Sequence, residues 1–562
     1  MSVTHEVLNQ STPFQDVNLF DSDLGLRDAL RFNAPQLDTA ALSRLGTEAG
    51  SAQTVAHARL ANTHPPELRT HDRFGHRVDE VEFHPSYHAL LGGALRHGLH
   101  GTPWSLGPGA HLQRAAGFIV WTQAEPSVLC PVSMSYAVTP ALRSNAALYD
   151  AWRTRIASTD YDARFAPLAH KTAVTLGMGM TEKQGGSDVR ANTTQAEADG
   201  SDAWGPRVRI TGHKWFLSAP MCDAFLVLAQ APAGLSCYFM PRWLPDGTPN
   251  VLRIQRLKDK LGNKANASSE VEFDRSAAWL VGEEGRGVPQ ILAMGAITRL
   301  DCALGTSGLM RHALALALHH CSERKAFGKR LIEQPLMKNV LADLALESEA
   351  ATALALRLAR AVDRTESGQD ADGHEALMRR VLTPIAKFWI CKRGSVFAQE
   401  AMECLGGNGY VEEHGEGAMA RVYREMPLNS IWEGAGNIMA LDLLRALRTG
   451  PVADALMHEL QPARGANGML DRLAAGLPAR VDGATDEAAA RRLARDVALL
   501  VQAALLKQHA PAEVFDTFCA SRLGDQLGGG GAFGLLDARA PLDALLARAT
   551  PHGSSTSMEP TR

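Results

Sequence analysis

One carboxylate, Glu433, stands between an indole and a Gly-Ala-Gly-Asn turn in the stretch from Met426 to Arg445, MPLNSIWEGAGNIMALDLLR, which ends in an apolar helical pattern. A carboxyl group beside a large aromatic ring is partly desolvated, which raises its pKa toward the working pH and suits it to abstract a proton. A Glu just before a helix also occurs as a capping residue or as a charge that compensates the helix dipole. Glu433 is therefore a candidate catalytic base, with the structural role as the alternative.

A second candidate is the loop from Met178 to Val189, MGMTEKQGGSDV, which combines hydroxyls with adjacent glycines. The hydroxyls belong to Thr181 and Ser187. Gly185 and Gly186 allow backbone amides to approach a ligand closely. This chemistry suits the edge of a polar ring and a pyrophosphate. A lone Gly-Gly-Ser is also typical of ordinary turns, so the loop gains meaning only from the motifs that accompany it.

The other metal-ligating and nucleophilic side chains follow no site pattern. One cluster of histidines is irregularly spaced, so we expect a structural role and no metal site for His64, His71, His76, His84 and His88. The eight cysteines form no CxxC pair and suit buried, reduced thiols; they are Cys130, Cys222, Cys237, Cys302, Cys321, Cys391, Cys404 and Cys519.

Length and composition indicate a globular protein of several domains around these candidates. The chain has 562 residues, beyond the size at which one hydrophobic core keeps growing, so three or four domains are expected. Its formal charge of -4 gives no global attraction for nucleic acid or an anionic membrane. No apolar run reaches the roughly eighteen residues of a membrane span, and the first Lys or Arg is Arg27. We therefore expect no membrane association, no signal or transit peptide and a cytoplasmic location.

Changes in periodicity predict the domain boundaries. Residues 1–170 mix helical segments with Pro and Gly breaks and predict an N-terminal helical domain. Residues 171–290 hold the short runs RVRITG, AFLVLAQ, LSCYFM, VLRIQRL and EVEFD, which predict a β domain. Long helical patterns return in residues 291–445 and predict a helical bundle. Residues 446–550 predict a further helical extension, and the composition of residues 551–562 is typical of a disordered tail.

Seven motifs stand in one order along the chain: TEKQGGSD, GHKWFLSAP, KLGNKANASSEVEFD, GEEGRG, ERKAFGK, CLGGNGY and IWEGAGN. Together they resemble the acyl-CoA dehydrogenase family, in that family's order, over residues 171–445. Other segments resemble more narrowly the AidB-like branch of this family. They are MTEKQGGSDV, RLDCALGTSGLMRH, IEQPLMKNVLADLALESEA and MPLNSIWEGAGNIMALDLLR, together with RVDEVEFHPSYH and the C-terminal helical extension. That branch is induced in the adaptive response to alkylating agents.

The resemblance implies a mainly α protein with a central β-barrel, the acyl-CoA dehydrogenase-like fold of helical domain, β-barrel and four-helix bundle, here followed by a C-terminal helical extension. It also implies a homotetramer, with FAD between barrel and bundle. In such enzymes a carboxylate removes the α-proton of an acyl-CoA thioester while the β-hydrogen leaves as hydride to flavin N5. Hydrogen bonds to the thioester carbonyl oxygen acidify that α-proton.

Carried over position by position, the resemblance also implies the FAD contacts. Met180 and Thr181 meet the pyrimidine edge of the isoalloxazine, Gly186 and Ser187 the pyrophosphate, and Phe216 and Ser218 the ring face and the N5 side. Arg324 and Phe327 of a neighbouring subunit, with Gly406 and Gly407, hold the adenosine diphosphate half. Arginine suits this diphosphate because its planar fork offers paired donors to phosphate oxygens.

Glu433 occupies the position of the family's catalytic base. Some members carry the base instead on a bundle helix, immediately before an Arg. In this chain that position is Thr298, followed by Arg299, which leaves Glu433 as the only candidate. The motif context that a base requires is thus present.

Four positions depart from the family pattern. Phe216 replaces the flavin-side Trp, Ser218 the usual Thr, Glu403 a Gln that commonly contacts the adenosine diphosphate, and Trp432 a frequent Tyr. We expect FAD binding to survive, since a hydroxyl and an aromatic ring are kept. Trp432 beside the base shortens the expected acyl pocket. The sequence therefore predicts slow or narrow acyl-CoA oxidation.

AidB-like proteins are also associated with double-stranded DNA through their C-terminal region. The formal charge of residues 446–562 is only -1, so bulk charge does not favour DNA. Local neutralisation of phosphates is predicted at two places on helical patterns, which are Arg445 with Arg448, and Arg491 and Arg492 with Arg495. The alternative is a solvated face paired with neighbours such as Asp486 and Glu487.

Three hypotheses of different classes follow. The first is an acyl-CoA dehydrogenase-type flavoenzyme with a restricted substrate range, or an ordinary metabolic member of that family. The second is a flavin-loaded protein that binds double-stranded DNA in the alkylation-damage response, with catalysis secondary or absent. The third is an oligomeric scaffold in which FAD only fills the fold, which the fold alone does not exclude.

Overall fold

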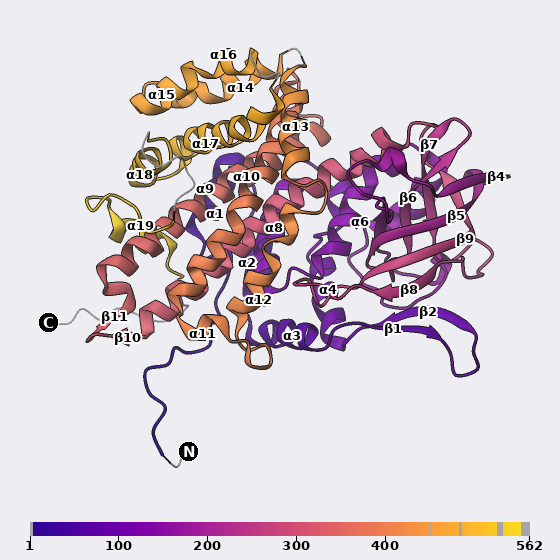
Figure 1. The fold of residues 1–562 in the computed structure, drawn as a ribbon, viewed down its shortest axis with the longest axis horizontal. Helices are drawn as coiled ribbons and strands as arrows, with labels where there is room; N and C mark the ends of the chain where they lie inside the picture. The colour runs from indigo at the N-terminus through magenta and orange to yellow at the C-terminus, as the bar shows by residue number, and fades with distance from the viewer. Residues whose placement is uncertain (1–3, 450, 483–485, 525–531, 552–562) are drawn as a thin grey trace. The chain divides into compact units, whose positions relative to one another are not determined.

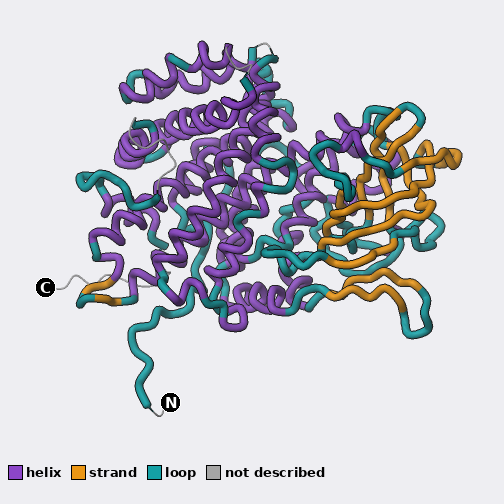
Figure 2. The backbone as a smooth tube through the Cα atoms, viewed as in Figure 1, coloured by secondary structure: helices purple, strands orange, loops and turns teal. Residues whose placement is uncertain are grey.

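The computed structural model describes residues 4–449, 451–482, 486–524 and 532–551, so the predicted tail at 551–562 lies outside the described residues except for its first position. The chain forms two compact units. Unit 1 comprises Met1–Val55, His111–Ala124 and Cys302–Arg562, and unit 2 comprises Ala56–Ala110 and Glu125–Asp301. Helices dominate unit 1, whereas the strands of the large sheet gather in unit 2 (Figure 2).

Unit 1 consists mainly of helices (Figure 1). They are α1 (Leu24–Asn33), α2 (Ala40–Ala49), α5 (Ala110–Ala124), α9 (Pro335–Glu366), α10 (His374–Cys404), α11 (Gly407–Tyr410), α12 (Ala418–Glu425), α13 (Gly436–Leu447), α14 (Val452–Leu460), α15 (Gly468–Ala475), α16 (Leu477–Asp482), α17 (Ala490–His509), α18 (Ala512–Arg522) and α19 (Leu542–Ala549). A small hairpin joins β10 (Lys325–Ala326) to β11 (Lys329–Arg330). Helix α8 (Gly287–Glu323) begins in unit 2 and continues into unit 1.

The core of unit 1 is built on α9 and α10, against which α13 and α17 pack. The middle of α17 is buried throughout, from Val497 to Leu506, because other helices cover it on several sides. Helix α19 packs on α9 as well. The C-terminal extension is therefore an integral layer of unit 1, as the gold helices in Figure 1 show.

Unit 2 combines helices with a seven-stranded sheet and a separate hairpin. Its helices are α3 (Ala52–Thr63), α4 (Pro85–Arg96), α6 (Leu129–Leu142) and α7 (Ala146–Ile156). The hairpin joins β1 (Glu67–His71) and β2 (Arg77–Glu82). The sheet contains β3 (Leu176–Gly179), β4 (Gln195–Asp202), β5 (Gly205–Ser218), β6 (Ala224–Ala231), β7 (Gly234–Pro241), β8 (Arg253–Leu257) and β9 (Ser268–Leu280).

The sheet pairings return to the strand from which they start. They run from β6 to β4, β5, β9 and β7, and β7 pairs with β6 again. Strand β3 adds to β6 in parallel, and β8 adds to β9. Because β6 has neighbours along both edges and is covered on both faces, its run AFLVLA is buried throughout.

The predicted strands are confirmed in residues 171–290, since the five runs fall in β5, β6, β7, β8 and β9. The hairpin of β1 and β2 was not predicted and lies within the segment that we expected to be helical. Its second strand, RVDEVE, has the period of two that a strand requires, with Asp79 and Val81 buried on one face.

All eight cysteines are buried and unpaired, which confirms the prediction of buried thiols. No described helix is long and apolar enough to cross a membrane. Within the described ranges, no group of three or more His, Cys, Asp or Glu side chains is arranged to hold a metal ion. The histidines at 64 and 84 stack on one another, with ring centroids 4.8 Å apart.

Candidate functional site

Glu433 lies half-buried in the turn that precedes α13. Its backbone φ is +59°, and that of Gly434 is +105°, so two consecutive residues adopt positive φ. A side chain in the left-handed region costs about 1 kcal/mol and persists only when its surroundings hold it. The N-cap of α13 is Ala435, so Glu433 does not occupy the capping position, which was one of its two alternative roles.

A buried lysine on α10 holds the backbone on both sides of Glu433. The Lys387 ammonium donates to the carbonyl oxygen of Trp432 at 2.7 Å and also to that of Gly434. Lys387 is only 1% exposed, so these bonds form away from water. The turn that carries Glu433 is thereby fixed to the core of unit 1.

A second chain of hydrogen bonds fixes the Trp432 side chain. Its indole Nε1 donates to Asn429 Oδ1 at 3.0 Å, and Asn429 Nδ2 donates to Thr306 Oγ1 at 3.1 Å. The buried Thr306 hydroxyl donates in turn to the carbonyl oxygen of Cys302 at 2.8 Å. The aromatic neighbour of Glu433 is therefore anchored to α8.

The alternative position for a base is occupied by Thr298, whose hydroxyl is engaged in a hydrogen bond. Thr298 is buried, and its Oγ1 donates to the carbonyl oxygen of Gly295 at 3.1 Å within α8. A threonine hydroxyl engaged with its own helix backbone is not a proton acceptor of the strength of a carboxylate.

In unit 2, the loop that begins at Met180 follows the end of β3. Asn192 Nδ2 donates to the Met180 carbonyl at 2.9 Å, and the Trp215 amide donates to the Thr181 carbonyl at 2.8 Å. A Cβ at Gly186 would lie 2.5 Å from Thr181 Oγ1, so any side chain there would force Thr181 to move. Ser187 is exposed at the same loop.

A buried ion pair stabilises this loop. Lys214 Nζ donates to Glu182 Oε1 at 2.6 Å, and both side chains are fully buried. Burial alone would raise the pKa of Glu182, but the Lys214 ammonium and the donors of Thr193 and Thr194 outweigh burial and lower that pKa to about 2. The residue after Thr181 thus ties the loop to β5 through an ionised pair.

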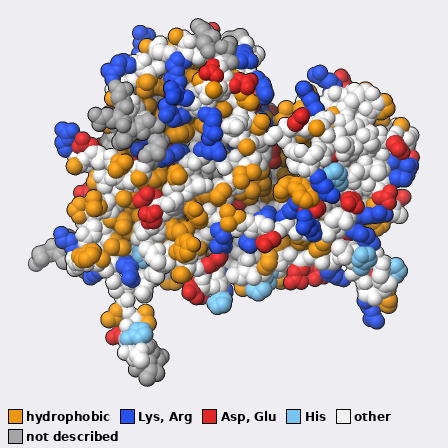
Figure 3. Space-filling model, viewed as in Figure 1, with side chains coloured by type: hydrophobic (Ala, Val, Ile, Leu, Met, Phe, Trp, Pro, Cys, Tyr) orange, Lys and Arg blue, Asp and Glu red, His pale blue; other side chains and the backbone are white. Residues whose placement is uncertain are grey.

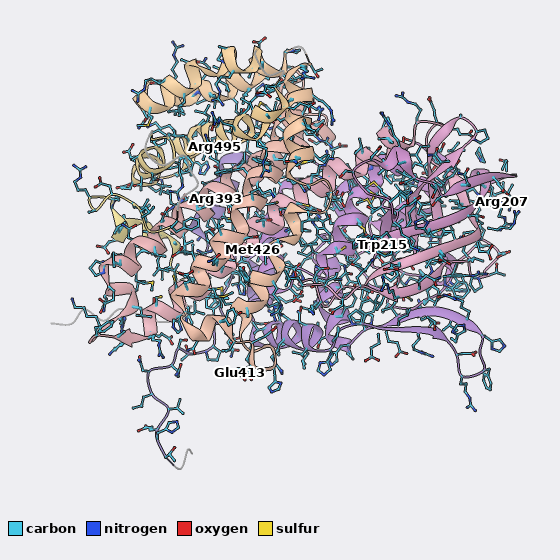
Figure 4. The ribbon with its side chains drawn as sticks, in the orientation of Figure 1. Arg207, Trp215, Arg393, Glu413, Met426 and Arg495 are labelled. Atoms are coloured by element: carbon cyan, nitrogen blue, oxygen red, sulfur yellow. The ribbon has the colours of Figure 1, made fainter. Side chains whose placement is uncertain are left out.

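The aromatic candidate of unit 2 projects from β5. Phe216 is 47% exposed, and Ser218, two residues further, is half-buried with its Oγ 3.4 Å from Ser268 Oγ. The Lys258 ammonium lies 3.3 Å from the ring centroid of Trp215, which is labelled on the sheet in Figure 4, and 4.7 Å from that of Phe216. Thr181, Phe216 and Ser218 therefore belong to one region of unit 2.

In unit 1, Arg324 precedes the β10–β11 hairpin, whose tip carries Phe327 with a φ of +52° and 97% of its surface exposed. Arg324 Nη1 donates to the Asn9 carbonyl at 2.6 Å. The side-chain amide of Asn9 exchanges two hydrogen bonds with the backbone of Lys325, at 2.8 and 2.9 Å. The N-terminal arm therefore lies on the base of this hairpin.

The same arm reaches the CLGGNGY turn. Gln10 Oε1 accepts from Asn408 Nδ2 at 3.2 Å and from Arg324 Nη1 at 3.4 Å. Gly406 has a φ of +61°, and a Cβ at Gly406 or Gly407 would meet no atom within 4 Å. This open backbone can admit a ligand closely. The structure thus brings the Arg324 motif and the Gly406–Gly407 motif together through Gln10.

The candidate DNA-contacting arginines lie on two helices of unit 1. Arg445 is in the last turn of α13 and Arg448 is its C-cap residue, and both are exposed. Lys and Arg side chains gather over the C-terminal helices in Figure 3, with acidic side chains among them.

Three of these arginines share the start of α17, where Figure 4 labels Arg495. The Arg495 side chain pairs with Asp496 at 2.6 Å, whereas Arg492 is exposed. Arg491 Nη1 donates to Asn437 Oδ1 at 3.4 Å, and Asn437 belongs to the IWEGAGN motif. Within unit 1, this group of arginines therefore adjoins the turn that carries Glu433.

The residues of these sites that were not predicted include Asn9, Gln10, Lys387 and Asn429. The first two are far from the motifs in the sequence, and Lys387 is one of several cations in a helical pattern. Only Asn429 had a signal, since it lies within MPLNSIWEGAGN and precedes Trp432 by three residues.

Three family models match the chain. Residues 9–163 match the N-terminal domain of the adaptive response protein AidB, residues 177–276 the middle domain of acyl-CoA dehydrogenases, and residues 285–448 their C-terminal domain.

Curated relatives agree with these matches. The chain is 48% identical to the putative acyl-CoA dehydrogenase AidB of Escherichia coli over 475 residues, covering 84% of this chain and 85% of the relative. It is 30% identical to acyl-CoA dehydrogenase family member 11 of Caenorhabditis elegans over 452 residues, covering 77% and 70%.

Solved structures with the same fold extend over most of the chain. The apo form of Bd2924 matches with a TM-score of 0.81 and 30% identity, covering 90% of this chain and all of that one. Caenorhabditis elegans ACDH-11 in complex with C11-CoA matches with a TM-score of 0.83 and 26% identity, covering 94% and 95%. An FAD complex of a Bacillus anthracis acyl-CoA dehydrogenase, 17% identical, shares the fold with a TM-score of 0.63.

Proposed function

Since the chain belongs to the acyl-CoA dehydrogenase family of FAD-dependent oxidoreductases, in its AidB-like branch, we propose that it oxidises an acyl thioester with Glu433 as the base. The observation that carries this proposal is the fixed, half-buried Glu433 turn, whose backbone Lys387 holds on both sides and whose Trp432 side chain is held by Asn429. In this mechanism Glu433 takes the α-proton of the substrate. When bound, the flavin supplies the acceptor for the β-hydride.

Several candidate residues carry groups that suit an FAD. In unit 2, we propose that Met180 and Thr181 meet the ring edge, Gly186 and Ser187 the pyrophosphate, and Phe216 and Ser218 the ring face and the N5 side. Arg324 and Phe327 of a neighbouring subunit, with Gly406 and Gly407, hold the adenosine diphosphate half. The chemistry of these groups supports the assignment, since they offer hydroxyls, a guanidinium, an exposed aromatic ring and glycine backbone with open space beside it.

The family architecture extends this proposal beyond the site. We assign residues 1–170 to the helical domain and residues 171–290 to a closed β-barrel. Residues 291–445 form the bundle, and residues 446–550 form the extension. The barrel assignment is supported by the strand pairings that lead from β6 back to β6. The active form is a cytoplasmic homotetramer, in which the half-buried Arg324 and the exposed Phe327 serve the adjacent subunit's cofactor.

The substrate is an acyl-CoA or a related thioester. A relative with 26% identity has been solved with C11-CoA, which supports this class. Trp432, packed beside the base and held by Asn429, favours a restricted acyl pocket. Oxidation is therefore slow or limited to few chain lengths.

This proposal predicts how the purified flavoprotein reacts with acyl-CoAs. Under anaerobic conditions, straight-chain acyl-CoAs of short, medium and long chain, C11-CoA included, are expected to reduce the flavin slowly or only within a narrow range of lengths, because Trp432 limits access. Flavin absorbance measured over time after mixing tests this. Rapid bleaching by all common chain lengths would instead indicate an ordinary metabolic acyl-CoA dehydrogenase.

We also propose a second function, the binding of double-stranded DNA in the alkylation-damage response. In the alternative form of this proposal, the protein is not catalytic, is stabilised by FAD and shields DNA. It is supported by relationship to the adaptive response protein AidB and by the arginines on α13 and α17. Arg491 is well placed to bind a phosphate, because its side chain is exposed and its guanidinium is held over the Phe388 ring. The distance from Arg491 Cζ to the ring centroid is 5.6 Å.

Reversing three charges on α17 tests this second function. The triple change Arg491→Glu, Arg492→Glu and Arg495→Glu is expected to weaken binding to duplex DNA and to reduce the slope of log K against log salt by about 3, since each phosphate contact contributes about 0.9. Fluorescence anisotropy with a labelled duplex at several salt concentrations measures the slope.

A matched control reverses three exposed charges elsewhere in unit 1, at Arg31, Arg44 and Arg539. This control changes net charge equally and is expected to leave the slope nearly unchanged. An unaltered slope in the α17 variant would remove these residues from a DNA interface.

A further inference from the structure

Lys387 is a cation in an unusual place. It lies on α10 with 1% of its surface exposed, and its hydrogen-bond acceptors are two main-chain carbonyls, those of Trp432 and Gly434. An ammonium loses much hydration energy on burial and stays charged there only when its donors are satisfied. Two of its three N–H donors bond the carbonyls that flank Glu433 directly.

The Glu433 turn needs such a hold. Glu433 and Gly434 both adopt positive φ, which turns the carbonyls of residues 432 and 434 toward Lys387. For a glutamate this backbone conformation is disfavoured, so the turn would relax toward other conformations if the ammonium were absent. The direction of the Glu433 side chain follows from that backbone.

We propose that Lys387 is a positioning residue that sets the orientation of the Glu433 carboxylate by fixing the turn on both sides of it. This inference rests on the proposed function, in which Glu433 is the base. Lys387 bonds only main-chain oxygens of the turn, so it acts through Glu433 and has no role in binding the acyl-CoA. Its loss therefore lowers the rate of proton abstraction and leaves substrate affinity in place.

The first test is Lys387→Met, which keeps a long apolar side chain and removes the donors. The rate of flavin reduction at saturating C11-CoA, or at the most reactive acyl-CoA of the panel, is expected to fall by about 100-fold, because small misplacements of a catalytic group have effects of that order. The acyl-CoA concentration for half-maximal rate and the FAD content are expected to stay within about twofold of the wild type. Unchanged reduction, or a loss of affinity and FAD together with the rate, overturns the proposal.

A matched control and a milder variant complete the series. Lys392→Met removes a cation from an exposed position of the same helix, where the Lys392 side chain lies beside Gly436, and is expected to behave like the wild type. Lys387→Gln retains two N–H donors on a shorter side chain and is expected to recover part of the rate. If Lys387→Met fails to fold, Lys387→Leu, which also lacks N–H donors, takes its place, and a wild-type rate in Lys387→Leu overturns the proposal.

Hydrogen exchange separates this proposal from the proposed function. In Lys387→Met, deuterium uptake by the peptide that spans residues 427–436 is expected to rise clearly above that of the wild type and of Lys392→Met, with no acyl-CoA present. Unchanged uptake removes Lys387 as the hold on the turn. A different result is that uptake rises in Lys387→Met although no acyl-CoA reduces the flavin of the wild type. That result would refute Glu433 as the base, whereas Lys387 would still be the residue that fixes the turn.

Discussion

Glu433→Gln is expected to lower the rate of flavin reduction by an acyl-CoA about 1000-fold, because an amide of the same size cannot accept the α-proton. The turn should keep its shape, since Lys387 binds main-chain oxygens on either side of residue 433 and not its side chain. The measurement is anaerobic stopped-flow absorbance of the flavin at saturating acyl-CoA. FAD content, duplex DNA affinity and thermal stability should match the wild type.

Glu413→Gln is the matched control for this change. Glu413, labelled in Figure 4, is also a glutamate of unit 1 with positive φ, at +40°, but it is exposed and begins a separate short helical turn, Glu413–Gly415. The same loss of a carboxylate there should leave the rate unchanged. A Glu433→Gln protein that reduces its flavin within about tenfold of the wild-type rate would show that another group is the base.

The sequence predicted those parts of the site that short motifs carry. IWEGAGN places an acid, an aromatic ring and a glycine turn within seven residues, and TEKQGGSD does the same for hydroxyls and glycines. Such local patterns are independent of the packing of distant segments. The structure supports each as a defined turn, at the start of α13 and at the end of β3.

The supporting residues were not predictable in the same way. Lys387 and Lys392 stand five residues apart in one helical pattern, and only the packing of α10 makes the first buried and the second exposed. Asn9 and Gln10 bind the Arg324 hairpin across more than 300 residues of chain. No periodicity within a window reports such long-range contacts.

The fold shows the same division. Runs such as AFLVLAQ predict a strand because apolar and β-branched residues suit a covered sheet, and β6 confirms this. The β1–β2 hairpin lies among helical segments and was missed. The division into two units, each assembled from separated stretches of chain, depends on tertiary packing and has no local signal.

A buried charge cluster explains how the C-terminal extension is held in unit 1. Arg357 of α9 is fully buried and forms two bonds to the Glu459 carboxylate of α14, at 2.6 and 2.8 Å, and one bond to Glu375 of α10 at 2.6 Å. Burial would raise the pKa of Glu459, but the hydrogen bonds and charge of Arg357 outweigh burial and lower that pKa to about 2. The cluster therefore stays ionised and links three helices.

Glu459→Gln is expected to destabilise unit 1 by about 3 kcal/mol at neutral pH, because a depression of the carboxyl pKa from 4.5 to about 2 corresponds to that free energy and Arg357 loses one of its two anions. The folded-state pKa lies below the unfolded value, so this stability is present above pH 4.5 and is lost as the pH falls toward 2. The difference between wild type and variant should thus shrink to less than half at pH 3. Urea unfolding at pH 7 and pH 3 measures both values.

Glu513→Gln, a change at an exposed residue of α18, is the control and should leave the stability unchanged. Equal stability of Glu459→Gln and the wild type at pH 7 would show that this cluster does not hold the extension.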